Sequence, residues 1–156
     1  MKKILILLTS LSFNYYCYGQ KALTFGQAKS QGISVEHLDS IYASGIDTDE
    51  KLSVFKTNQD KYFEAYQNLL QDFGKFLKKN NFLWSKTTKG FNRIYFDKSG
   101  KIEYFLYNFK PDQLTKEQEK TFGDLLQSFI KTYTFPLKAS RKFAQCSPVT
   151  YMPATK

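Results

Sequence analysis

Two segments rich in aromatic and β-branched residues, joined by a short turn, constrain the fold more than any other feature. Residues 91–96 and 101–109 flank Asp97-Lys98-Ser99-Gly100, and a four-residue connection that ends in glycine is typical of a β-hairpin. Alternate side chains of a strand point to opposite faces. The second strand therefore divides into Ile102, Tyr104, Leu106 and Asn108 on one face and Glu103, Phe105, Tyr107 and Phe109 on the other. Both faces are largely apolar, so either helices or another chain must cover the second face, or it exposes Tyr and Phe for binding.

Two helices with aromatic stripes are predicted to pack on this hairpin. Within residues 59–79 the stripe advances in steps of four and three, the helical repeat: Tyr62, Tyr66, Leu69, Phe73 and Phe76. Thr115 and Gln118 fit a capping box for a second helix over residues 116–132, and Pro136 prevents its continuation. We interpret both stripes as core.

The remaining segments are expected to be short. Residues 20–33 look like an arm, and Ser34 begins a short amphipathic helix that stops at Gly45. Residues 82–84 are predicted as a short strand, and residues 143–151 as a last strand in which Pro148 favours an edge position. The sequence thus predicts one α+β domain over residues 20–156: N-terminal helices and an antiparallel, hairpin-based sheet packed against helices 59–79 and 116–132.

The N-terminus has the organisation of a secretory signal peptide. Met1-Lys2-Lys3 precedes the apolar run 4–13, which suits a signal and is shorter than the roughly 20 residues of a membrane-spanning helix. Cleavage after Gly19 is expected, with lipidation of Cys17 as the alternative. The Lys-Lys start and the Gln20 junction resemble signal peptides of Gram-negative bacteria, particularly Bacteroidetes. We therefore expect an exported protein, periplasmic or extracellular, with no transmembrane span in the mature chain.

Cleavage would change the charge and the cysteine content. Losing Lys2 and Lys3 lowers the formal net charge from +9 to +7, and losing Cys17 leaves Cys146 alone. A single cysteine permits no internal disulfide, so Cys146 is expected to be a buried small apolar residue, an intermolecular disulfide partner or a reactive thiol.

Few residues suggest catalysis. His37 is the single histidine, and a pair with Cys146 lacks the local turn of known cysteine enzymes. No spacing selects two of the carboxylates Glu64, Asp72, Glu103 and Asp124 as the pair of a glycosidase. Phosphate-binding glycine loops are absent, and no metal or cofactor is predicted. We expect no nucleic-acid partner, because the lysines form no dense stripe and the chain is expected to be exported.

Basic residues are nevertheless concentrated in and after the hairpin. They are Arg93, Lys98, Lys101, Lys110, Lys138, Arg141 and Lys142. An anionic partner, such as an acidic protein or an envelope surface, should therefore contact this half of the chain. A generally soluble basic surface is the alternative interpretation.

Residues 91–151 also resemble a known family. They contain a strand, a D-x-x-G turn, a second strand, a helix with Leu125-Leu126, Pro136 and a last strand through Pro148-Val149-Thr150-Tyr151. This order is similar to the β-β-α-β C-terminal domain of TonB-type energy transducers, over about 60 of the 156 residues. The membrane anchor and Pro-rich linker of that family are not found. The resemblance implies β-augmentation, in which an edge strand, here residues 143–151, pairs with an extended segment of a partner.

These observations favour an exported, non-enzymatic domain that binds a protein or another envelope component through its aromatic hairpin and edge strand. A homodimer through the sheet edge is also possible on this basis. The predicted contact residues are Trp84, Arg93, Tyr95, Tyr104, Phe105, Tyr107, Phe109, Phe143 and Tyr151. One alternative is a periplasmic small-ligand carrier with a pocket between sheet and helix, lined by Tyr62, Tyr66, Trp84, Tyr95, Tyr104 and Tyr107. A small hydrolase is the other.

Overall fold

The computed structural model describes residues 19–153. Residues 1–18 of the expected signal peptide, Cys17 included, lie outside the described residues. The elements follow the order β1 (Lys21–Thr24), α1 (Phe25–Ser30), α2 (Val35–Ile41), β2 (Ala43–Ser44), α3 (Gln59–Lys79), β3 (Thr88–Phe96), β4 (Ile102–Phe109), α4 (Lys116–Thr132) and β5 (Phe143–Tyr151). The predicted α+β class is confirmed, and helices α3 and α4 have the expected bounds.

The sheet has five strands in the order β1-β4-β3-β5-β2. Its three central strands are antiparallel, because β3 pairs with both β4 and β5 in that direction. The two short outer strands run parallel to their neighbours, β1 beside β4 and β2 beside β5. The sheet is therefore mixed, and both outer strands belong to the N-terminal segment of the chain.

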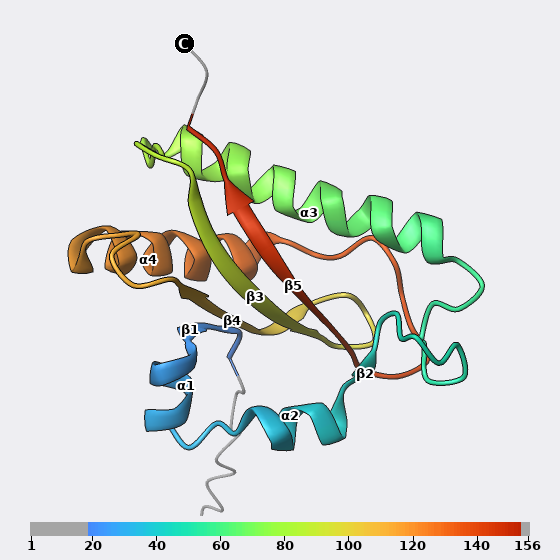
Figure 1. The fold of residues 1–156 in the computed structure, drawn as a ribbon. Helices are drawn as coiled ribbons and strands as arrows, with labels where there is room; N and C mark the ends of the chain where they lie inside the picture. The colour runs from blue at the N-terminus through green and yellow to red at the C-terminus, as the bar shows by residue number, and fades with distance from the viewer. Residues whose placement is uncertain (1–18, 154–156) are drawn as a thin grey trace, which may run out of the picture.

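Helices of the chain itself cover both faces of this sheet (Figure 1). On one face α3 and α4 form the larger core, which includes Phe73, Phe105 and Phe122 at 0% exposure. On the other face α1 and α2 bury Tyr95 and Leu106, also at 0%, beneath Leu38. The second apolar face of the hairpin is thus part of a core, because the N-terminal helices supply the cover that its composition requires.

A β-bulge changes which residues of β4 share a face. Tyr95 pairs with Tyr104 and Phe96 pairs with Ile102, so Glu103 is an extra residue opposite β3. Ile102 consequently packs with Phe105 in the larger core. Glu103 points to the α2 side, where Tyr42 donates to it. The strict alternation predicted from the sequence was wrong at these two positions, because a bulge inserts one residue without a sequence signal.

The N-terminal segment is more regular than expected. Residues 20–33 are not an arm, because Lys21–Thr24 form a strand and Thr24 starts helix α1 through a capping box with Gln27. Helix α2 begins after Ser34 as predicted, but it ends at Ile41 and not at Gly45, since Ala43 and Ser44 pair with β5.

Residues 82–84 do not form the predicted strand. Helix α3 ends at Lys79 with Asn80 as its C-cap, and Asn81 turns the chain with a φ of 61°. The rings of Phe82 and Trp84 then pack against Phe122 of α4. The apolar character of this segment reflects core packing and not pairing in the sheet.

The hairpin turn requires a glycine at position 100. Gly100 has a φ of +92°, and a Cβ atom there would lie 2.3 Å from the carbonyl oxygen of Phe135. We expect Gly100→Ala to lower the free energy of unfolding by about 2 kcal/mol or more, because it adds both strain and overlap. Urea denaturation measures this change.

Gly74→Ala in α3 is the matched control, since nothing lies within 4 Å of its added Cβ atom. Alanine should raise the free energy of unfolding there by about 0.5–1 kcal/mol. Equal effects of the two substitutions would contradict the turn geometry.

Candidate functional site

The two edges of the sheet differ in how far the chain closes them. At the β1 edge, Gln127 of α4 acts in place of a further strand. Its Oε1 accepts from the Ala22 N–H at 2.9 Å, and its Nε2 donates to the Gln20 carbonyl at 2.9 Å. The side chain of Gln20 in turn donates to the Ile130 carbonyl at 2.6 Å. Helix α4 therefore leaves little of the β1 edge available to a partner.

The β5 edge is covered only at its start. Strand β2 pairs with Phe143 and Ala144, and the Gly45 N–H donates to the Ala144 carbonyl at 2.8 Å. Because the backbone groups of a strand alternate between its two sides, those of Cys146, Pro148 and Thr150 also point away from β3. The Cys146 carbonyl accepts from Nε2 of Gln145 at 3.0 Å. Within residues 19–153, the other outward backbone N–H and C=O groups of Cys146, Pro148 and Thr150 form no hydrogen bond with the backbone of another segment.

Side chains on the two faces frame this open edge. On the α3 face, Tyr62 donates to Oε1 of Gln145 at 2.9 Å, and the hydroxyls of Tyr66 and Ser147 lie 2.5 Å apart. Farther along, the rings of Trp84 and Tyr151 stack with centroids 4.3 Å apart. Leu83 and Met152 project beside this stack with exposed fractions of 59% and 64%. The open edge thus ends at a partly exposed apolar surface.

Cys146 lies on the opposite face of β5 and is exposed. The first expectation, a buried small apolar residue, was therefore wrong. The reason is that the apolar core on this face includes Ala144 but does not extend along β5 to Cys146. An intermolecular disulfide or a reactive thiol remains a prediction.

The nine predicted contact residues do not form one surface. Phe105 and Phe143 are buried in the larger core, and Tyr107 is 3% exposed. Tyr95 is fully buried on the second face, where its hydroxyl donates to Oδ1 of Asp39 at 3.0 Å. These four residues stabilise the fold. They are unavailable to a partner in this structure because helices cover both faces of the hairpin.

The structure leaves the other five predicted residues partly accessible, at two places. Trp84, Phe109 and Tyr151 lie together near the end of β5, with ring centroids 4.3–6.1 Å apart. Arg93 and Tyr104 lie on the α2 side of the sheet, where Arg93 forms an ion pair with Asp39. Tyr62 and Tyr66, expected in a carrier pocket, are also core residues. Four of the six aromatics predicted for that pocket, Tyr62, Tyr66, Tyr95 and Tyr107, are buried and fill the space between sheet and helices instead of lining it.

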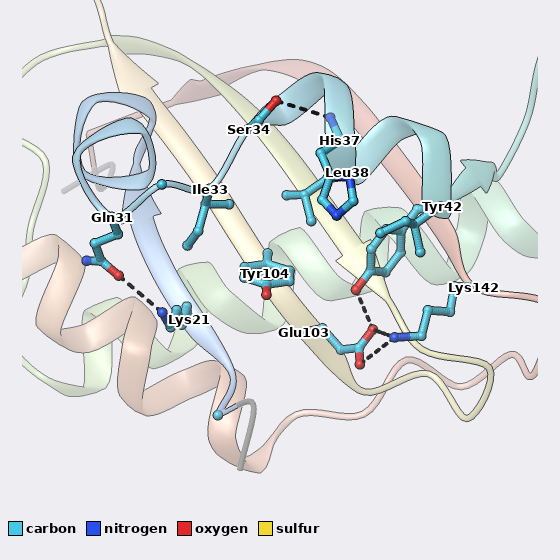
Figure 2. Close-up of a pocket in the computed structure, with 13 residues that line it drawn as sticks. Lys21, Gln31, Ile33, Ser34, His37, Leu38, Tyr42, Glu103, Tyr104 and Lys142 are labelled. Atoms are coloured by element: carbon cyan, nitrogen blue, oxygen red, sulfur yellow. Dashed lines mark hydrogen bonds and ion pairs between the residues drawn. The ribbon is translucent and has the colours of Figure 1, made fainter. Parts of the chain in front are cut away.

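A cavity lies between the loop that joins α1 to α2, helix α2 and strand β4, on the second face of the sheet (Figure 2). Its volume is about 520 Å³. Leu38 and Ile33 face Tyr104 across the cavity, and the His37 side chain points from α2 toward the same space. Polar groups stand at its two ends, Lys21 with Gln31 at one and Lys142 with Glu103 at the other.

An ionic network closes the Lys142 end of the cavity. Lys142 donates to both carboxylate oxygens of Glu103, at 2.9 and 2.7 Å, and the Tyr42 hydroxyl donates to Oε2 at 2.5 Å. The Lys142 ammonium also lies 5.2 Å from the centroid of the Tyr42 ring. Burial, and then the Glu103 carboxylate, raise the pKa of Tyr42 far above its ordinary value. Tyr42 therefore stays a neutral donor that ties α2 to β4.

Sequence reasoning named only Tyr104 among the predicted contact residues that line this cavity. It missed Lys21, Tyr42 and Lys142 as a group, and it interpreted His37 as an ordinary helix residue. One usable signal was present, since Glu103 is the single charged residue inside the apolar strand 102–109. Its direction depends on the bulge, and its partners are 39 and 61 residues away along the chain.

The candidate catalytic groups are not brought together. His37 and Cys146 line different cavities. Glu103 lies on the α2 side of the sheet, whereas Glu64, Asp72 and Asp124 belong to α3 and α4 on the other side. In the described part of the chain, no cluster of three or more His, Cys, Asp or Glu side chains suits a metal ion. No helix among residues 19–153 has the length and hydropathy to cross a membrane.

Comparison with known proteins gives no match to a protein family, to a curated protein or to a solved structure.

The Gln127 contact predicts a local effect at the β1 edge. Gln127→Ala removes two hydrogen bonds to the backbone of β1, so we expect the free energy of unfolding to fall by about 1–2 kcal/mol. The Ala22 amide should also exchange with solvent faster, which hydrogen-exchange NMR measures. Ser128→Ala, one residue farther on an exposed position of α4, should change neither quantity. Unchanged exchange at Ala22 in the Gln127→Ala variant would contradict the role of Gln127.

The buried tyrosines predict a steep loss of stability in alkali. Burial is the first cause that raises the pKa of seven tyrosines, to about 12 for Tyr107 and Tyr133 and further for others. The seven are Tyr42, Tyr62, Tyr66, Tyr95, Tyr107, Tyr133 and Tyr151. The unfolded chain releases these protons near pH 10, about two pH units or more before the folded chain does at most of these sites.

The free energy of unfolding is therefore unaffected by these groups below about pH 10 and falls above it, by up to about 1.4 kcal/mol per pH unit for each fully buried tyrosine and by less for the partly buried Tyr133. Tyrosinate absorbance and circular dichroism, recorded together against pH, should change in one cooperative step above pH 10. The urea-unfolded chain should titrate near pH 10 in the same buffers. Ionisation of all the tyrosines near pH 10 with an intact fold would contradict this expectation.

Proposed function

We propose that this chain is an exported, non-enzymatic binding domain that takes an extended segment of a partner protein at the open edge of β5. The observation that carries the proposal is the difference between the two sheet edges. Gln127 and α4 close the β1 edge, whereas β2 covers β5 only as far as Ala144. A strand edge with unpaired backbone groups is a template for β-augmentation.

The outward backbone groups define what a partner strand would bind. Cys146 and Thr150 offer N–H donors, and Pro148 and Thr150 offer carbonyl acceptors. Pro148 has no N–H, so a partner can pair on each side of it but receives no donor from it. A second copy that pairs antiparallel about Pro148 would place two residues without an N–H opposite each other. We therefore propose a different protein and not a homodimer as the partner at this edge.

Export is part of the proposal and rests on residues 1–19 of the sequence. Its supports are the Lys-Lys start, the apolar run 4–13 and the small residue Gly19. The resemblance to TonB-type C-terminal domains also favours a partner in the cell envelope. Strands β3 and β4, helix α4 and strand β5 follow one another in the order that this resemblance implies.

The partly exposed rings at the end of β5 extend this surface. Trp84 and Tyr151 stack on each other, and Leu83 and Met152 project beside them. A partner strand that passes Thr150 would meet these side chains on the α3 face. The aromatic contribution to binding is thus proposed for this cluster, in place of the buried rings of the hairpin.

The proposal predicts that one backbone N–H decides binding. Thr150→Pro removes an outward donor but leaves the bonds between β5 and β3 in place, because Thr150 does not donate to β3. We expect this substitution to lower the affinity for peptides selected from a random linear library by about tenfold or more. Fluorescence anisotropy of labelled peptides measures the affinity, and circular dichroism checks the fold.

Thr150→Val is the matched control, since it keeps the N–H and the β-branched shape. It should bind the selected peptides as the original chain does. Bound peptide should also slow exchange of the Cys146 and Thr150 amides. Selected peptides that bind Thr150→Pro undiminished, or that protect neither amide, would overturn the proposal.

A further inference from the structure

We infer that the cavity between the α1–α2 loop, helix α2 and strand β4 binds a small amphipathic carboxylate. This site lies on the second face of the sheet, lined mainly by residues of β1, the α1–α2 loop, α2 and β4. It is separate from the outward backbone groups of Cys146 and Thr150, so the inference does not depend on the proposed β5 partner.

The shape of the cavity suits a small organic molecule. Its volume of about 520 Å³ falls within the roughly 300–1,000 Å³ usual for ligand pockets. The central part is apolar, with Ile33 and Leu38 above and the ring of Tyr104 below (Figure 2). Ile41 also lines it and is 47% exposed. An apolar ligand body that packs against Ile41 would bury apolar surface that now faces water.

The charge of the lining favours an anion at the Lys21 end. Glu103 is the one carboxylate among the described residues that line the cavity, and Lys142 and Tyr42 already bind it. Lys21 has no such partner in the described part of the chain, where its ammonium donates to Oε1 of Gln31 at 3.2 Å. A neutral amide leaves the charge of Lys21 unmatched, so the cavity has a net positive charge at this end.

The two ends therefore differ in chemistry, and this sets the orientation of the ligand. A carboxylate can accept from Lys21 and from the amide nitrogen of Gln31, since both are donors. The apolar body then extends over Tyr104 toward His37 and Tyr42. A second charged group at the far end is disfavoured, because Lys142 and Glu103 already neutralise each other there. One anionic head with one apolar body is the chemistry that fits.

Helix α2 is held in place before any ligand binds. Ser34 caps its start, accepting from the His37 N–H at 3.2 Å. Asp39 binds both Arg93 and Tyr95 of β3, and Tyr42 binds Glu103 of β4. Contacts along the helix thus fix the distance between α2 and the sheet. A preformed cavity loses less entropy when it binds a ligand than one that must be assembled.

The test uses the protein as cells process it: the full chain is expressed in a Gram-negative host, purified, and its N-terminus read by mass spectrometry. The probe is anilinonaphthalene sulfonate, an apolar anion that fluoresces when it leaves water. We expect saturable binding to the folded protein, displaced by decanoate and at least about tenfold more weakly by decanol. Near-ultraviolet circular dichroism confirms that the protein is folded.

Two matched pairs of variants locate the site. Lys21→Gln should weaken displacement of the probe by decanoate about tenfold and leave displacement by decanol unchanged. Lys29→Gln, on the exposed side of α1, should change neither displacement. Ile33→Asp should abolish displacement by decanoate, and Leu83→Asp, at the other apolar surface, should not. Equal displacement by decanoate and decanol would overturn the anionic chemistry. Loss of probe binding in Leu83→Asp but not in Ile33→Asp would overturn the location.

Discussion

The burial of the β3–β4 hairpin on both faces is the constraint on which the rest of the structure depends. Phe105 and Tyr95 stand on opposite faces of the same pair of strands, and each is fully buried. Burying apolar surface contributes about 25 cal/mol of stability for each Å² removed from water. Both faces of the hairpin make this contribution only if helices cover each of them. Helices α3 and α4 meet this need on one face. Helices α1 and α2 meet it on the other, so the N-terminal segment is a structural layer and not an appendage.

This arrangement leaves the molecule with two unequal features that suit binding. The second layer is thinner, because α1 and α2 have six and seven residues against 21 and 17 for α3 and α4. Such short helices cover Tyr95 and Leu106 but leave a cavity over Tyr104. The edge of the sheet is also covered incompletely, because the two residues of β2 pair only with the start of β5. Both features arise because the N-terminal helices and strand β2 are shorter than the sheet face and the sheet edge that they cover.

Sequence patterns predicted the parts of the fold that repeat regularly. The stripes of α3 and α4, the capping box at Thr115 and the D-x-x-G turn each use a local rule, and each prediction agreed with the structure. The capping box at Thr24 follows the same rule and was overlooked. The bulge at Glu103 and the exposure of Cys146 follow no local rule. The bulge depends on how β3 and β4 register, and the exposure of Cys146 depends on how far the second-face core extends along β5.

By itself the sequence determined the fold class, the two long helices, the hairpin and the apolar character of both of its faces. Periodicity encodes these, since each follows from side chains within a few positions of one another. Only the tertiary structure decided which aromatics reach solvent and which polar groups meet. Glu103 finds Tyr42 and Lys142 from distant segments, and Gln127 reaches β1 across more than 100 positions. Contacts at such separations depend on how whole layers stack, and no window of sequence contains that information.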